Sequence, residues 1–590
     1  MSHYKRHAGV IIGLLGLAIL AFPAIAAEQP WTTRSNENAK LLLDVMARYA
    51  PERASGLGVD GHDERITDLA TDQFAAQSRD TRAVIARLTR RLAGERDPKV
   101  RQDLEILIKA ANDQLRTNTL NRQYFLPYFN VGQLLYGVVH DTLDPRVAPE
   151  RRQKIVARLE KYAGLTKGYR PISELAIERF RARLASDNKL LGPYKGEVEQ
   201  ALNDGPVLLQ GIKDLLIKYE VSGWEPAYAA LAQQLATYDI QLRKQILPFA
   251  RSDHRLPPEV YADRLRQAGV DIPPRELVAR ALTAFAEIRN QLVITAGLVA
   301  REQNLPDADY RAVIRELKKQ QIAPELALPL YVERLAQLEA AVRAHQIVSL
   351  PERKALIRIA SSAENARQPA PHMNEPRLIG NTGEYGEFVL TTGLPPDASG
   401  KRLVFDDFTH QAGSWTLTAH EARPGHELQF AKMLEIGVST ARAVFAFNSV
   451  NAEGWALYAE AEMQPFEPLD GQLFALQARM QRAARAFLDP MVNLGEISAD
   501  SVKHFLMDEV GLSEAMATQE MQRYTFRDPG QATSYFYGYQ RLMETRQAAE
   551  VALRQKINRR AFNDFVLAQG LIPPALLRKA VLEEFVPSSQ

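Results

Sequence analysis

Cysteine is absent from all 590 residues of this sequence. Its absence excludes disulfide bridges, thiolate nucleophiles, iron–sulfur clusters and zinc sites of the cysteine type. We therefore expect no lipid anchor attached through cysteine. A metal site in this chain must be built from His, Asp or Glu side chains.

An excess of one charge is also lacking, because 73 Lys and Arg residues stand against 71 Asp and Glu residues. The resulting net charge of +2 gives no reason to expect nucleic acid or an anionic surface as a partner. With 46% hydrophobic and 24% charged residues, the chain has the composition of a globular protein rather than a disordered one. Its length predicts roughly two to four domains, or one large helical unit.

Long apolar runs occur only at the N-terminus. Lys5 and Arg6 precede a small and apolar run over residues 8–21, and small residues continue to Ala26. A basic start, a short apolar stretch and small residues are the parts of a secretory signal peptide. We predict that the signal peptide, residues 1–26, is removed and that the mature protein is exported, periplasmic or secreted, without membrane contact. The alternative is an uncleaved membrane anchor, for which the run is short.

Helical periodicity dominates the rest of the chain. Apolar residues at steps of three, four and seven form one stripe: Leu277, Ala281, Phe285, Ile288, Leu292 and Val299. The pattern changes near residue 350, where Leu356–Ile359 and Glu387–Thr392 each have the composition of a short strand. We predict a mainly α protein with one small β-sheet. Its parts are an N-terminal helical region, residues 27–350, and a C-terminal region with the sheet and metal-binding helices, residues 351–590.

The densest cluster of reactive side chains runs from Thr418 to Gln429. It contains His420, Glu421 and His426, and a His-Glu pair followed by another His resembles the zincin metalloprotease signature. In that signature two His residues one turn apart bind zinc, and the Glu between them acts as a general base.

The spacing of the two His residues departs from the signature. They lie six positions apart, which places them about 120° apart on an ideal helix, so an uninterrupted helix cannot aim both at one metal. Pro424 and Gly425 lie between them and can break or kink the helix. The alternative is that Thr418 and Glu421 form a capping box, with both His residues on the surface or in a polar core.

A second cluster, Asn451–Glu460, contains two acidic residues in an otherwise largely apolar segment. Glu453 lies 27 residues after His426, and Glu460 lies seven residues further on the same helix face. A carboxylate on such a face is costly to bury unless it is paired or bound to a metal. We predict Glu453 as the third zinc ligand and Glu460 as the residue that orients a ligand. The alternative is a solvated or salt-bridged Glu on an amphipathic helix.

A third cluster begins at Arg523 and contains tyrosines after a Pro-Gly turn. Tyr535 and Tyr537 are candidates to donate a hydrogen bond to an oxyanion, and Arg546 to bind a carboxylate of the substrate. The alternative is that these are ordinary core aromatics and a surface arginine. We also predict that the strand containing Phe388 binds an extended peptide by strand addition.

Three ordered motifs, His420–Gln429, Glu453–Glu460 and Pro529–Arg546, give the sequence a family resemblance. With them it resembles the bacterial DUF885 family (domain of unknown function 885), which is grouped with the zincin-like metallopeptidases. The resemblance covers most of the chain and implies one continuous family domain from about residue 35 to residue 585.

The resemblance implies a large helical, zincin-like metallopeptidase fold with the small sheet near the active site. It further implies zinc at His420, His426 and Glu453, with Glu421 as the base, and it implies no substrate. Glu427 stands where many members of the family carry a second His.

Together these features predict a secreted zinc-dependent hydrolase, a peptidase that acts on peptides or peptide-like substrates. Three protein ligands leave a fourth position for water, whose pKa zinc lowers from roughly 15.7 to about 7, and Glu421 takes its proton. Two alternatives remain open. One is a non-catalytic helical periplasmic binding or scaffold protein that keeps the metal site, and the other is a zinc hydrolase of non-peptide amides or esters.

Overall fold

The computed structural model describes residues 30–391 and 405–590, so the predicted signal peptide, residues 1–26, lies outside the described residues. Helices make up most of the described chain, and three short strands form one sheet. The prediction of a mainly α protein with a small sheet is confirmed. Among the described helices, none is both long and apolar enough to cross a membrane.

The N-terminal half is a group of helices that surround their own core. Their bounds are α1 (Pro30–Tyr49), α2 (Pro51–Gly56), α3 (Phe74–Gly94), α4 (Pro98–Tyr124), α5 (Val131–Thr142), α6 (Pro149–Arg152), α7 (Ile155–Tyr162), α8 (Ile172–Ser186), α9 (Lys195–Lys218) and α10 (Glu225–Gln241), with η1 (Leu242–Ile246) and η2 (Leu247–Phe249). Tyr136, Leu159, Phe180 and Ile212 are central in this core, while α1, α3 and α4 form a smaller bundle beside it.

The next helices belong to the C-terminal body. They are α11 (Pro258–Ala268), α12 (Pro274–Glu302), α13 (Tyr310–Lys318) and α14 (Pro324–Ala344). The predicted stripe of six apolar residues lies within α12, and all six are buried. They pack on α19 (Leu469–Asn493), where the rings of Phe285 and Phe487 meet edge to face at 5.5 Å. The sequence pattern therefore identified this helix and its buried face.

The sheet has the strand order β1-β3-β2. β1 (Leu356–Ile359) is parallel to β3 (Glu387–Leu390), and β2 (His372–Asn374) is antiparallel to it. Helix α15 (Ser362–Arg367) lies between β1 and β2 in the chain. β1 has its predicted bounds, and β3 ends at Leu390, while Thr392 of its predicted range lies outside the described residues. Because β3 is the central strand, both of its edges are paired, and the prediction that it binds a peptide by strand addition is wrong.

The remaining helices complete the C-terminal body. They are α16 (Gly413–Glu421), α17 (His426–Ile436), η3 (Ala441–Phe445), α18 (Ser449–Met463), η4 (Gln464–Phe466), α20 (Ala499–Asp508), α21 (Glu514–Gln522), η5 (Arg523–Arg527), η6 (Gln531–Thr533), α22 (Ser534–Leu553), η7 (Arg554–Lys556), α23 (Arg559–Ala568), α24 (Pro574–Ala580), η8 (Val581–Phe585) and α25 (Val586–Ser588). Helices α16, α18, α19 and α22 pack on one another at its centre.

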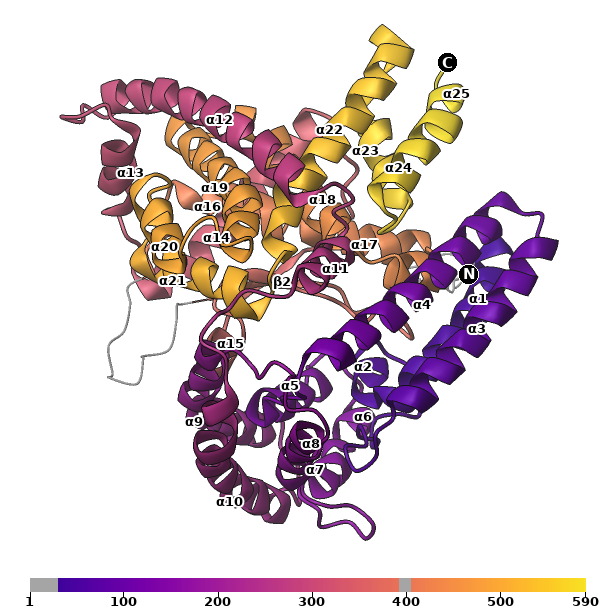
Figure 1. Ribbon diagram of the computed structural model, residues 1–590. Coiled ribbons are helices and arrows are strands. Elements are labelled where there is room, and N and C mark those ends of the chain that lie inside the picture. Colours follow the sequence, from indigo (N-terminus) through magenta and orange to yellow (C-terminus); the bar gives the residue numbers. More distant parts are fainter. Residues whose placement is uncertain (1–29, 392–404) are drawn as a thin grey trace, which may run out of the picture.

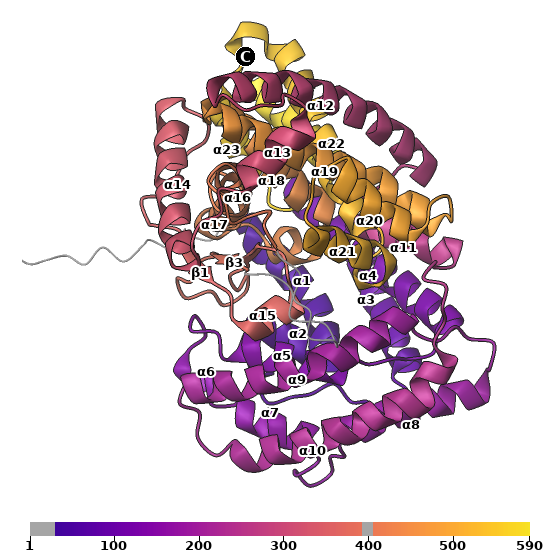
Figure 2. The same ribbon diagram turned by 90° about the vertical axis from the view of Figure 1, so that its left-hand side faces the viewer.

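Figures 1 and 2 show the N-terminal helices at one end of the molecule and the C-terminal body at the other. Helices α11–α14 precede residue 350 in the chain, yet α12 and α13 share the core of the C-terminal body. Packing partners therefore change near residue 250. The division of the chain into regions 27–350 and 351–590 stays a prediction.

Candidate metal centre

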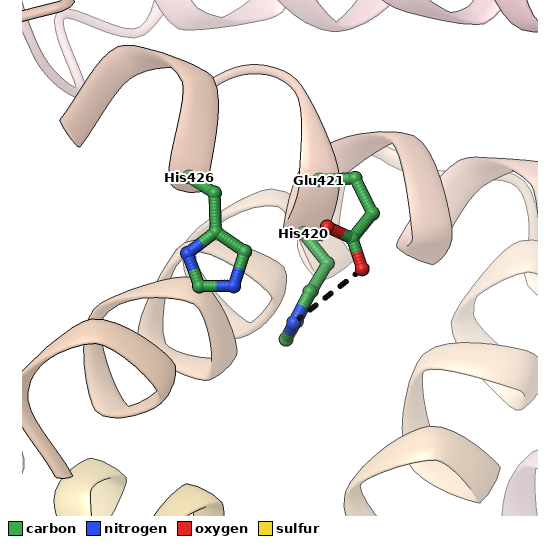
Figure 3. Close-up of side chains that lie close together, drawn as sticks. All are labelled: His420, Glu421 and His426. Atoms are coloured by element: carbon green, nitrogen blue, oxygen red, sulfur yellow. Dashed lines mark ion pairs between the residues drawn. The ribbon is translucent and has the colours of Figure 1, made fainter. Parts of the chain in front are cut away.

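A tight turn brings His420 and His426 together. Helix α16 ends directly after His420 and Glu421, and α17 begins at His426. At Gly425 the backbone folds back so closely on α16 that an added Cβ would lie 1.9 Å from the carbonyl oxygen of His420. Only glycine fits there. The turn places the two imidazole rings edge to face, with centroids 4.8 Å apart (Figure 3).

Helix α18 is fixed against this turn and brings Glu453 to the two imidazoles. The indole Nε1 of Trp455 donates to the carbonyl oxygen of Pro424 at 3.0 Å and is 3.3 Å from that of Gly425. On the same helix, Oε2 of Glu453 lies 3.2 Å from Nε2 of His426 and 3.5 Å from Nε2 of His420. All three predicted ligands therefore point at one place.

These separations fit a metal ion. Tetrahedral zinc with bonds of about 2.0–2.2 Å to nitrogen and carboxylate oxygen keeps its ligand atoms about 3.4 Å from each other. Two imidazoles and a carboxylate are also the donor types that zinc accepts in a catalytic site. A second carboxylate, that of Glu421, lies near both imidazoles, and one ligand atom each of His420, Glu421 and His426 falls within 4.8 Å of the others. We assign Glu453 as the ligand because its oxygen is nearer to both nitrogens.

A carboxylate behind His420 fixes the orientation of this ring. Oε1 of Glu460 lies 2.6 Å from Nδ1 of His420, and Oε2 of Glu460 accepts a hydrogen bond from the Thr416 hydroxyl at 2.7 Å. This contact directs Nδ1–H to Glu460 and leaves Nε2 for a metal. Burial by itself lowers the pKa of His420, but hydrogen bonds to Glu453 and Glu460 outweigh it and raise that pKa to about 9.

The carboxylates at the centre differ in their surroundings. Burial by itself raises the pKa of Glu453, but hydrogen bonds with His420 and His426 hold it well below its usual 4.5. Glu421 makes no hydrogen bond with the described residues and lies 3.9 Å from Nε2 of His420 (Figure 3). Burial raises the pKa of Glu421, against the opposing effect of the two imidazoles. The site therefore holds one carboxylate between the imidazoles and a second beside them.

Comparison with known proteins agrees with the sequence motifs. The profile of a bacterial protein family of unknown function, DUF885, matches residues 51–581. The chain belongs to the DUF885 family. None of the curated proteins matches the sequence of this DUF885 protein.

Two solved structures share the DUF885 protein's fold. "A putative lipoprotein of unknown function from Shewanella oneidensis" superposes with a TM-score of 0.70 at 17% identity, covering 94% of this chain and 100% of that one. A "putative lipoprotein from Colwellia psychrerythraea" has the same TM-score at 18% identity, covering 94% of this chain and 99% of that one.

Two further predicted residues of the DUF885 protein take different positions on α22. The ring of Tyr535 stacks on that of His420 with centroids 6.1 Å apart, and its hydroxyl accepts a hydrogen bond from Arg523 at 2.9 Å. The hydroxyl of Tyr537 instead donates to Asp271, so the structure does not bring Tyr537 to the centre. Two positions along a helix turn a side chain by about 200°, so the two tyrosines cannot face one site.

The predicted substrate contacts are not supported. Phe388 is completely buried and packs edge to face on Tyr331, so it cannot touch a substrate. The guanidinium of Arg546 is already bound by the carboxylates of Glu462, at 2.5 Å, and Glu550, at 2.8 Å. Both residues stabilise the packing of the DUF885 protein.

Glu427 points away from the centre. Its carboxylate is completely buried and forms ion pairs of 2.6 Å with both Arg353 and Arg423. The residue that stands where many family members carry a second His is therefore part of a buried ion-pair network.

Sequence reasoning missed two charged neighbours of the centre. Arg523 begins the third sequence cluster, but its type and position predict no role for it, because its contact with Tyr535 depends on how η5 packs. Glu375 follows β2, where Met373 and Leu378 pack against α17 and α18. The Glu375 side chain is open to a cavity of about 830 Å³, and its charge interacts with His426 and Glu453. No periodicity or spacing marked Glu375.

Proposed function

We propose that this protein is an exported zinc-dependent hydrolase of the zincin-like type, and that its substrates are peptides. One observation carries the proposal. Nε2 of His420 and Nε2 of His426 lie 3.5 Å and 3.2 Å from the same oxygen of Glu453, while the carboxylate of Glu421 beside them makes no hydrogen bond with the described residues. Ligands at metal spacing with an adjacent free base form the minimal set for metal-assisted hydrolysis.

Each residue has a part in the proposed reaction. His420, His426 and Glu453 hold the metal, which when bound supplies Lewis-acid polarisation and lowers the pKa of water. A carboxylate oxygen of Glu421 takes the proton of the attacking water and passes it to the leaving amine. Burial raises the pKa of Glu421, which makes it a stronger base than an exposed glutamate.

Tyr535 is the residue we propose for the developing oxyanion. Its hydroxyl oxygen accepts a hydrogen bond from Arg523, so its own proton is free to be donated to the substrate oxygen. The stacking of its ring on His420 places it beside the proposed metal ligands. Tyr537 has no part in this proposal.

Export is supported by two observations. Residues 1–26 have the parts of a secretory signal peptide, and the two similar solved structures are described as putative lipoproteins, a class of exported proteins. This chain has no cysteine, so it differs from a cysteine-anchored lipoprotein in that respect.

The decisive experiment measures metal and turnover together. Purified protein is analysed for zinc and incubated with a mixed peptide library, beside the variants Glu421→Gln and His426→Ala. We expect bound zinc and peptide cleavage in the wild type. Glu421→Gln should keep the zinc and lose cleavage by roughly 100-fold or more, because only the base is removed. His426→Ala should lose the zinc.

Glu435→Gln is the matched control, because Glu435 lies on α17 and pairs with Lys432 at 3.6 Å, away from the centre. It should behave as the wild type. If Glu421→Gln cleaves as fast as the wild type, the mechanism is wrong. Zinc without hydrolysis of peptides, amides or esters identifies the non-catalytic binding or scaffold protein. Hydrolysis confined to non-peptide amides or esters identifies the third candidate function.

A further inference from the structure

A second cavity lies between the N-terminal helices and the C-terminal body. Its volume is about 970 Å³, and none of the proposed metal ligands lines it. Its walls come from α4, α8 and α9 on one side and from α11 and η5 on the other. Cavities at such junctions are common ligand sites.

The cavity is rich in arginine. Six arginines line it, against four acidic residues and no lysine. Two of the four carboxylates already form ion pairs. Asp72 pairs with Arg122 at 2.7 Å. Glu178 pairs at 2.5 Å with Arg170, which does not line the cavity. The lining therefore has an excess of positive charge.

Four of these arginines form no ion pair with any described residue: Arg183, Arg251, Arg264 and Arg527. Arg183 and Arg251 donate only to neutral oxygens, and Arg527 donates to the amide of Gln522. Burial lowers the pKa of Arg251 and of Arg527, because the nearby acids do not compensate for the lost water. Half-buried cations without anions are costly.

Three polar atoms on the lining are buried and without a hydrogen-bond partner among the described residues. They are Nε of Arg179, Nε of Arg251 and the hydroxyl oxygen of Tyr128. Buried donors in folded proteins are nearly always satisfied, so all three indicate an acceptor that the chain itself does not provide. Aromatic side chains complete the walls, with Phe125, Tyr194 and Phe526 among them.

We propose that this cavity binds a small organic anion that joins an apolar group to at least two negative charges on phosphate or carboxylate oxygens. Guanidinium groups match such oxygens in pairs, and the aromatic walls bury the apolar part. The site is separate from the metal centre and stands whether or not the protein is a hydrolase.

Titration calorimetry on the whole purified protein tests the proposal with defined probes. Phenyl phosphate and phthalate carry an aromatic ring with a phosphate or two carboxylates, and inorganic phosphate lacks the ring. We expect one or both ring-bearing probes to bind more tightly than inorganic phosphate by about tenfold, with affinity falling as salt rises. Which of the two binds better distinguishes phosphate from carboxylate recognition. Removal of metal by a chelator should leave this affinity unchanged.

Arg264→Gln and Arg527→Gln should each lower the affinity for the more tightly bound probe by about tenfold or more. Each substitution removes a charge-assisted hydrogen bond to the probe. Arg275→Gln is the control, because Arg275 is 79% exposed, pairs with Glu496 and lies outside the cavity. Circular dichroism and melting without ligand verify that the variants fold. The proposal is overturned if neither ring-bearing probe binds the wild type, if both arginine variants bind as the wild type does, or if the chelator abolishes binding.

Discussion

Two carboxylates hold the imidazole of His420, one at each nitrogen. Glu460 binds Nδ1 at 2.6 Å, and Glu453 faces Nε2 at 3.5 Å. Together they raise the pKa of His420 to about 9, so a proton occupies the site when no metal does. Metal binding must displace that proton, and zinc affinity should therefore fall as pH falls. At the scale of single residues, zinc binding at the centre is therefore coupled to release of a proton from His420.

Glu460→Gln should weaken zinc binding by about 10-fold to 100-fold, because the amide still accepts from Nδ1 but no longer increases the basicity of the ring. A competition titration with a chromophoric chelator measures this affinity. Thr416→Val is the control and should change zinc affinity less than Glu460→Gln does, because it removes only the hydroxyl that donates to Glu460. Equal zinc affinities in Glu460→Gln and the wild type would contradict the role given to Glu460.

Glu467 should make the stability of the protein depend on pH. Its two carboxyl oxygens are buried without a hydrogen-bond partner among the described residues. Burial, followed by repulsion from Glu460, raises its pKa from 4.5 to about 8. The folded protein therefore keeps this proton up to about pH 8, whereas the unfolded chain releases it near 4.5. The contribution of Glu467 to the free energy of unfolding therefore falls as pH rises from 4.5 to about 8.

Glu467→Gln should stabilise the protein more at pH 8 than at pH 5, because the amide stays neutral at both. Thermal melting across this range measures the difference between variant and wild type. The melting temperature of Glu467→Gln should still fall somewhat as pH rises, because burial also raises the pKa of Asp489 to about 8. A variant whose melting temperature follows that of the wild type at every pH would show that Glu467 is ionised in the folded protein.

At the scale of elements, two close approaches of backbone determine the centre. At Gly425 the turn after α16 lies against the carbonyl groups of that helix. Where α18 crosses α22, Gly454 and Gly538 are in direct contact, and a Cβ on Gly538 would lie 2.0 Å from the carbonyl oxygen of Val450. The first contact joins the two imidazoles, and the second brings α22 with Tyr535 beside α18 with Glu453.

Gly425→Ala should disrupt the centre, since its Cβ would collide with backbone that cannot move without shifting α16. We expect a loss of roughly 2–4 kcal/mol in the free energy of unfolding, together with weaker zinc binding. Gly297→Ala in α12 is the matched control, because nothing lies within 4 Å of its added Cβ. It should be neutral or stabilise by up to about 1 kcal/mol. Denaturant titration compares the two, and wild-type zinc affinity in Gly425→Ala would contradict this account of the turn.

At the scale of the whole molecule, a buried charge cluster joins the N-terminal bundle to the C-terminal body. Asp103 of α4 is completely buried and pairs with Arg442 of η3 at 2.9 Å. It also accepts hydrogen bonds from Ser35 of α1 and Ser439 before η3. Breaking such a pair leaves a buried charge without its partner, which costs far more than losing a surface pair.

Asp103→Ala should destabilise the protein by about 3–5 kcal/mol and accelerate hydrogen exchange in α1, α3 and α4. Trp31, whose ring lies 5.1 Å from the guanidinium of Arg442, is one of four tryptophans, and its contribution to the fluorescence should change when the bundle separates. Asp80→Ala is the control, since its partner Arg48 is 62% exposed and the pair contributes at most about 1 kcal/mol. Equal unfolding energies for the two variants would contradict the account of Asp103.

Some predictions from the sequence agree with the structure because they depend on local rules. The stripe on α12 is buried as its periodicity requires, and β1 begins and ends where predicted. Tyr537 and Arg546 are predicted from side-chain type and Phe388 from the strand that contains it, and neither property says whether a neighbour already occupies the side chain. Their partners Asp271, Tyr331 and Glu462 lie far from them in the chain.

The sequence by itself determined the helical character of this protein, its family, and the residue types available to hold a metal. These follow from composition, periodicity and motif order, which need no knowledge of distant contacts. Only the tertiary structure decided that His420, His426 and Glu453 converge and that β3 has no free edge. Convergence depends on backbone approaches of a few ångströms between separate helices, and a linear pattern of residues does not encode which approach occurs.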